Sequence, residues 1–208
     1  MPSTKRSTRR AAVPAEPEVQ LVWFSTALEE LTAFLRSADV FRPLHHPPSG
    51  MALDLSLGAL LLAADALTAF ADDLAPAQRL RWDQGRRRWE TQLASHAAAI
   101  DAKAVAELPH RLNLWRAYLQ DLAEKAAEAA AYPTEVRHRV IISRLLEGLR
   151  DARGDASRHQ LQPLDQDLRQ RAESAPFVWA PALARVYPPE SYWFLYLRLL
   201  IPLGRTPA

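Results

Sequence analysis

The sequence contains no cysteine, and glycine is scarce, with six in 208 residues. Without cysteine the chain can form neither disulfides nor thiolate metal sites. No glycine-rich phosphate loop and no nucleophile-elbow pattern occurs either. These absences argue against several common classes of enzyme and metalloprotein, and they leave no catalytic motif to start from.

Segments typical of membrane or secreted proteins are also lacking. No uninterrupted apolar run reaches the roughly 20 residues that a bilayer-spanning helix needs, and Asp65 interrupts the most apolar one. The basic residues 1–10 are not followed by the apolar region of a secretory signal. We therefore expect no transmembrane segment and a cytoplasmic location.

Strand-forming residues are few and rarely alternate with polar ones, whereas alanine and leucine dominate. Apolar residues instead recur at three- and four-residue steps, which is typical of helices docked on a core. The pattern predicts an all-α fold, a bundle of about five helices. We expect these helices near residues 18–36, 53–74, 76–100, 109–131 and 134–150.

The segment 53–74 is the most apolar long stretch, and we expect it to form the central helix. Its leucines cover nearly the whole circumference, as in a helix enclosed by others. Asp54, Asp65 and Asp72 fall on one narrow stripe. Because an unpaired carboxylate in mid-helix is costly, Asp65 should pair with an arginine of the fourth or fifth helix, or line a polar cavity. Asp54 is expected to cap the helix.

Two Glu-x-x-His pairs, Glu107 with His110 and Glu135 with His138, resemble part of a di-iron carboxylate signature. Both pairs are expected at the starts of their helices, so about 30 Å should separate them. That distance argues against a shared metal. His138 lies on the apolar face of its helix, and we interpret it as a buried core histidine. No metal ligand, cofactor or catalytic residue is assigned.

The chain divides into a flexible basic tail (1–17), a helical bundle (18–175) and a C-terminal arm rich in aromatic residues and proline (176–208). The arm is either buried on its own bundle, or it completes a protein partner or a second copy in a homo-oligomer. The candidate partner-interface residues are Trp179, Tyr192, Trp193 and Tyr196.

Positive charge is concentrated in two places, although the net charge is only +2. The segment 79–90, RLRWDQGRRRWE, combines arginines with two tryptophans that the periodicity turns inward. This helix face is either merely solvated or binds an anionic partner together with the tail. The candidate residues are Arg81, Arg86, Arg87 and Arg88 on the helix, and Arg6, Arg9 and Arg10 in the tail.

Three functional hypotheses follow. The first is a non-enzymatic helical interaction module, such as an adaptor, an assembly factor or a small subunit of a larger complex. The second is a nucleic-acid-associated helical subunit that uses the arginine-rich face and the tail. The third is a metal- or carboxylate-dependent enzyme centred on Asp65, with Asp54 and His138 as further buried polar candidates.

Overall fold

The computed structural model describes residues 16–45, 54–149 and 152–200. In these ranges the chain forms six α-helices. They are α1 (Pro17–Arg36), α2 (Leu57–Ala69), α3 (Pro76–Ser95), α4 (Ala97–Glu124), α5 (Tyr132–Gly148) and α6 (Asp155–Gln170). The prediction of an all-α bundle is confirmed. Among the same residues, no helix is both long and apolar enough to cross a membrane.

Short elements connect the helices and build the arm. Five 3-10 turns occur in the described ranges: η1 (Ala71–Asp73), η2 (Ala126–Ala131), η3 (Ala152–Gly154), η4 (Pro181–Arg185) and η5 (Trp193–Leu195). Two three-residue strands, β1 (Ala172–Ser174) and β2 (Leu197–Leu199), pair antiparallel with Ala172 opposite Leu199. This small sheet joins the segment that follows α6 to residues 197–199 of the arm.

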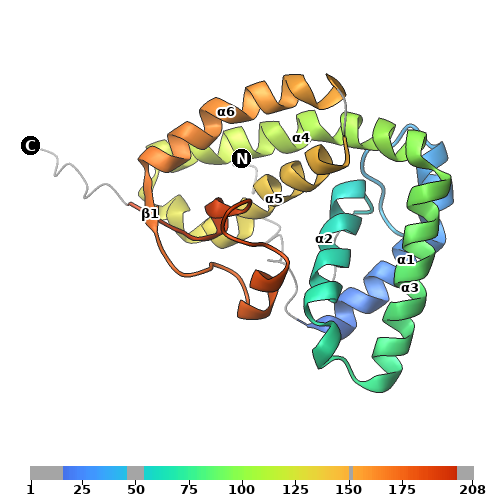
Figure 1. Cartoon of the computed structure of the whole chain (residues 1–208). Helices are drawn as coiled ribbons and strands as arrows, with labels where there is room; N and C mark the ends of the chain where they lie inside the picture. The colour runs from blue at the N-terminus through green and yellow to red at the C-terminus, as the bar shows by residue number, and fades with distance from the viewer. Residues whose placement is uncertain (1–15, 46–53, 150–151, 201–208) are drawn as a thin grey trace, which may run out of the picture.

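Figure 1 shows how the helices are arranged. α1 and α3 lie side by side at one end of the molecule, and α4 runs from there to the end formed by α5, α6 and the arm. α2 lies between α1 and α5 and contacts both, as well as α4 and η4. The long helix α4 contacts all five other helices, so it joins the two ends of the molecule.

The prediction that a helix starts near Pro109 is wrong. α3 ends at Ser95, α4 begins at Ala97, and Pro109 lies inside α4. A proline in a helix interior lacks one backbone hydrogen bond and costs about 3 kcal/mol. Here the helix buries Ala104 and Leu108 before the proline and Leu112 after it. The free energy gained by burying these side chains exceeds the cost of placing a proline inside the helix.

The most apolar helix is shorter than predicted. α2 begins at Leu57 because the Ser56 hydroxyl accepts a hydrogen bond from the Ala59 amide at 3.1 Å, the usual reach of an N-cap. The expected cap, Asp54, lies too early in the chain and is exposed. α2 ends at Ala69, and Asp72 belongs to η1. The predicted stripe of aspartates is therefore wrong, and only Asp65 lies on α2.

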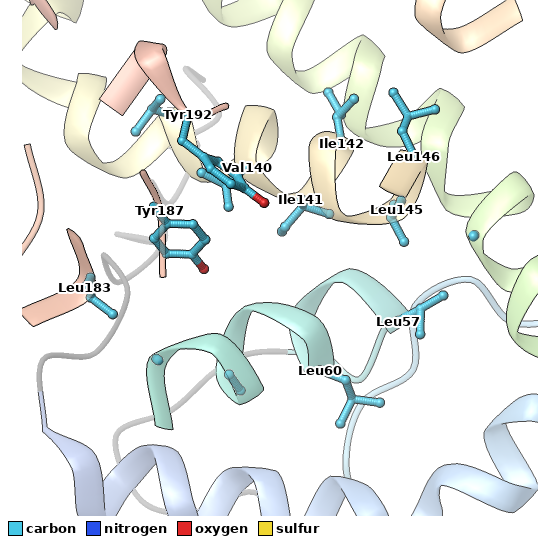
Figure 2. Packing of buried hydrophobic residues seen from close by; sticks show 14 of the residues in the cluster. Leu57, Leu60, Val140, Ile141, Ile142, Leu145, Leu146, Leu183, Tyr187 and Tyr192 are labelled. Atoms are coloured by element: carbon cyan, nitrogen blue, oxygen red, sulfur yellow. The ribbon is translucent and has the colours of Figure 1, made fainter. Parts of the chain in front are cut away.

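The core between α2, α5 and the arm is shown in Figure 2. Ile141 and Leu145 of α5 point toward α2, as does the hydroxyl of Tyr187 of the arm, whereas Leu60 of α2 points to the opposite side of its helix, away from α5. The arm is packed against α5 as well. The Arg139 guanidinium lies 4.3 Å from the centre of the fully buried Phe194 ring. The described residues of the arm thus complete the core of their own bundle.

Candidate functional site

Asp65 lies at a junction of α2, α5 and the arm. Arg144 Nε is 2.8 Å from Asp65 Oδ2, and Arg144 Nη2 donates to Asp65 Oδ1 at 3.1 Å. The Tyr187 hydroxyl donates to Asp65 Oδ2 at 3.1 Å. The prediction that Asp65 pairs with an arginine of the fourth or fifth helix is confirmed.

The same arginine extends this cluster toward the arm. Arg144 Nη1 also forms an ion pair with Glu147, and the Tyr192 hydroxyl donates to Glu147 Oε1 at 2.7 Å. Arg144 therefore joins two carboxylates, each of which holds one tyrosine of the arm. We call these five side chains the arm cluster.

Burial shifts the pKa of Asp65 and of the two tyrosines in the arm cluster. Desolvation raises the pKa of Asp65 above its ordinary value, and the neighbouring Arg144 offsets this only in part. Desolvation also raises the pKa of Tyr187 and Tyr192, and the carboxylates they contact push it in the same direction. Both tyrosines remain neutral donors, so their chemistry here is that of hydrogen bonding.

A second polar cluster surrounds Glu107, which is only 1% exposed. Glu107 Oε1 accepts hydrogen bonds from Ser56 Oγ at 2.9 Å and from Arg111 Nε at 2.8 Å. Glu107 Oε2 accepts from the backbone amide of Gly58 at 2.9 Å. Because Gly58 lies in the first turn of α2, the carboxylate also faces the positive end of that helix dipole.

Arg111 connects Glu107 to the fully buried His138 of α5. Arg111 Nη1 lies 3.3 Å from His138 Nδ1, and Arg111 Nη2 donates to Ser56 Oγ at 3.1 Å. A guanidinium can only donate, so Nδ1 is the acceptor and Nε2 carries the proton. His138 Nε2 lies 3.6 Å from Glu135 Oε2. The interpretation of His138 as a buried core histidine is confirmed.

The predicted separation of the two Glu-x-x-His pairs is wrong in part. α5 folds back along α4, which places Tyr118 beside Tyr132 and Arg111 beside His138. Glu107 and His138 are consequently bridged by one guanidinium. A cation already lies between the two groups, which suits an ion pair better than a metal. Within the described residues, no group of three histidine, aspartate or glutamate side chains is arranged to hold a metal ion.

Sequence reasoning missed Arg111 altogether. Glu107 and Arg111 are one helical turn apart, at the spacing of an ion pair along a helix. That signal was available, but the same spacing is common on solvated faces. Only the burial of both side chains makes this pair part of the core.

The arginine-rich helix face corresponds to the exposed side of α3. Trp82 and Trp89 are buried, with ring centroids 5.6 and 6.4 Å from that of Phe24, so their predicted inward orientation is confirmed. Arg81 pairs with Glu18 at 2.9 Å, and Arg86 pairs with Glu90 at 2.8 Å.

The remaining two arginines of this face differ from their neighbours. Arg87 and Arg88 are exposed, and neither forms an ion pair with a carboxylate in the part of the chain that the structure describes. The tail candidates Arg6, Arg9 and Arg10 lie outside the described residues. Two of the four helix candidates are therefore locally neutralised, and two are not.

The four aromatic candidates for a partner interface make contacts within the chain. Tyr192 is buried in the arm cluster, and the other three are half-buried. Trp179 Nε1 donates to the Pro133 carbonyl at 2.7 Å, and the Tyr196 hydroxyl donates to the Tyr187 carbonyl at 2.8 Å. Trp193 lies under the Arg169 guanidinium at 3.5 Å. These contacts hold the arm in place.

Comparison with known proteins gives no further guidance. No protein-family model, no curated protein and no solved structure matches this chain.

Proposed function

We propose that this chain is a non-enzymatic helical interaction module, such as an adaptor, an assembly factor or a small subunit of a larger complex. The observation that supports this proposal is the exposure of α3. This helix of 20 residues buries only Trp82 and Trp89, and most of its other side chains are exposed. A helix that contributes so little to its own core is well suited to contacts with another molecule.

The buried polar groups favour the same proposal over an enzyme. Both oxygens of Glu107 accept hydrogen bonds from groups of the fold itself, and Asp65 is held by Arg144 and Tyr187. Groups in such contacts join helices to one another. Their donors would have to be displaced before either carboxylate could act on a substrate.

Affinity capture of the full chain from its native cells tests this proposal. The tagged protein is recovered with and without nuclease and washed at moderate salt. A stoichiometric protein partner that survives nuclease supports an interaction module. Recovery of the chain alone from both preparations, as a monomer in size-exclusion chromatography with light scattering, contradicts it.

A nucleic-acid-associated subunit is the second candidate, and the exposed, unneutralised Arg87 and Arg88 favour it. Arginine guanidinium groups bind phosphates strongly, and such binding weakens steeply as salt is raised. We expect binding to a duplex oligonucleotide at low salt to be lost in the variant R86E/R87E/R88E. Binding that this variant retains, or none by the wild type at low salt, would exclude this use of α3.

A further inference from the structure

α3 carries a continuous stripe on the side opposite Trp82 and Trp89. Its members alternate at three- and four-residue steps, the spacing of a helix–helix seam. They are Ala77, Leu80, Gln84, Arg87, Thr91 and Ala94, and all of them are exposed. We call this set the α3 outer stripe. It runs for about 26 Å, at roughly 1.5 Å per residue.

Leu80 is the one large apolar side chain of this stripe. It is 58% exposed, more than any other large hydrophobic side chain in the described ranges. Single exposed leucines are common on protein surfaces. Leu80 differs because the small side chains of Ala77 and Ala94 continue its stripe and would let a second helix approach closely.

The charge around the stripe is positive. α3 contains five arginines and two carboxylates, a net charge of +3, and Glu18 of α1 neutralises one of these arginines, Arg81. Asp83 and Glu90, on one edge, already lie within ion-pair distance of Arg79 and Arg86. Arg88 on the other edge and Arg87 in the stripe have no such neighbour among the described residues. The surface therefore favours a partner that supplies carboxylates.

A second copy of this chain does not fit the α3 outer stripe. In a parallel pair of α3 helices, Arg87 would face its own symmetry mate. In an antiparallel pair, the edge with Arg88 would face the same edge of the second copy, where Arg88 would meet arginines and no carboxylate of α3. Both arrangements place like charges together, which is unfavourable.

Nucleic acid fits less well than an acidic helix. Bases bind single-stranded readers by stacking on exposed aromatic rings, and the two tryptophans of α3 are buried beneath the stripe. Leu80, the one large apolar side chain of the stripe, would face phosphates with which it cannot form hydrogen bonds.

We infer that the α3 outer stripe is the docking surface for an acidic amphipathic helix of a protein partner. This inference rests on the proposed function and names the chemistry of the partner. Leu80 packs on the apolar face of the partner helix, while Arg87 and Arg88 bind its flanking carboxylates. The complementary charges set the orientation and speed the association.

A synthetic helix provides the test. The probe is a labelled three-heptad peptide with leucine at its seam positions and glutamate beside them, and its binding to the full chain is followed by fluorescence anisotropy. Leu80→Gln should weaken binding by about tenfold, because an apolar contact is lost. The variant R87E/R88E should weaken it at least as much, and the effect should shrink as salt is raised.

Three controls make the result decisive. The variant R185E/R198E changes the net charge equally at exposed sites in the arm, and it should bind as the wild type does. A peptide of the same composition, scrambled to break its apolar face, should bind at least tenfold more weakly. Circular dichroism should show that every variant keeps its helix content, since the altered side chains are exposed.

Several results would overturn the inference. They are equal binding of the scrambled peptide, equal loss in R185E/R198E, no effect of Leu80→Gln, or preference for a duplex oligonucleotide over the acidic peptide. If affinity capture recovers a protein partner that Leu80→Gln and R87E/R88E both retain, the proposed function stands and this docking surface does not.

Discussion

Gly58 provides the sharpest test of how this fold is held together. It lies in the first turn of α2, and its backbone amide donates to Glu107. A Cβ atom added at Gly58 would lie 2.2 Å from Ile141 Cγ2 and 2.7 Å from Glu107 Oε1. Unbonded carbon atoms prefer separations of about 3.5–4.0 Å. Gly58→Ala must therefore move α2 away from α5, shift Glu107, or both.

The cost of Gly58→Ala follows from opposing contributions. Overpacking in a core typically costs about 1–3 kcal/mol. Each hydrogen bond to the charged Glu107 that weakens adds up to about 1.5–3 kcal/mol. The better helix propensity of alanine returns about 1 kcal/mol at most. We expect a net loss of about 2–4 kcal/mol in the free energy of unfolding, and a Tm lower by roughly 5–15 °C for a chain of this size.

Urea denaturation followed by far-UV circular dichroism, together with calorimetry, measures this loss. Gly85→Ala is the matched control, because Gly85 is also helical but an added Cβ would meet nothing closer than Phe24 Cε1 at 3.6 Å. That variant should be as stable as the wild type, or more stable by up to about 1 kcal/mol. In a double-mutant cycle, Gly58→Ala and Ile141→Ala together should cost less than the sum of the two single losses, because Ile141→Ala removes the clashing methyl group. The reasoning is refuted if Gly58→Ala is as stable as Gly85→Ala.

Three further predictions concern the buried ionisable groups. Because burial raises the pKa of Asp65, its ionisation opposes folding; the unfolding free energy of the wild type should fall relative to that of Asp65→Asn as the pH rises through and above 3.8, the ordinary value. Urea titrations of both proteins across this range measure that difference, and a constant difference would contradict the prediction. Glu107→Gln should cost about 3–5 kcal/mol because it leaves the buried Arg111 without its charged partner. The double variant E107L/R111M should lose less, because it removes both charges, and a loss as large as that of Glu107→Gln would contradict this. Lys103→Met should cost about 1–3 kcal/mol, because the Lys103 ammonium donates to two backbone carbonyls just after α1; a Tm equal to that of the wild type would show that solvent replaces these contacts.

The sequence by itself determined the fold class and some individual environments. Helical periodicity depends only on residues a few positions apart, so the inward orientation of Trp82 and Trp89 was predictable. The ion pair of Asp65 was predictable for an energetic reason, because a carboxylate on so apolar a helix must find a partner when it is buried. The proposed use of α3 in binding stays a prediction that these patterns motivate.

Only the tertiary structure decided which groups meet. Many arginines of the chain could have paired with Asp65. Arg144 does so because α5 packs against α2. Pro109 lies inside a helix because the burial on both sides of it exceeds its local cost. Arg111 reaches His138 because α5 folds back on α4. Contacts between residues far apart along the chain depend on how helices pack, and helical periodicity carries no information about that packing.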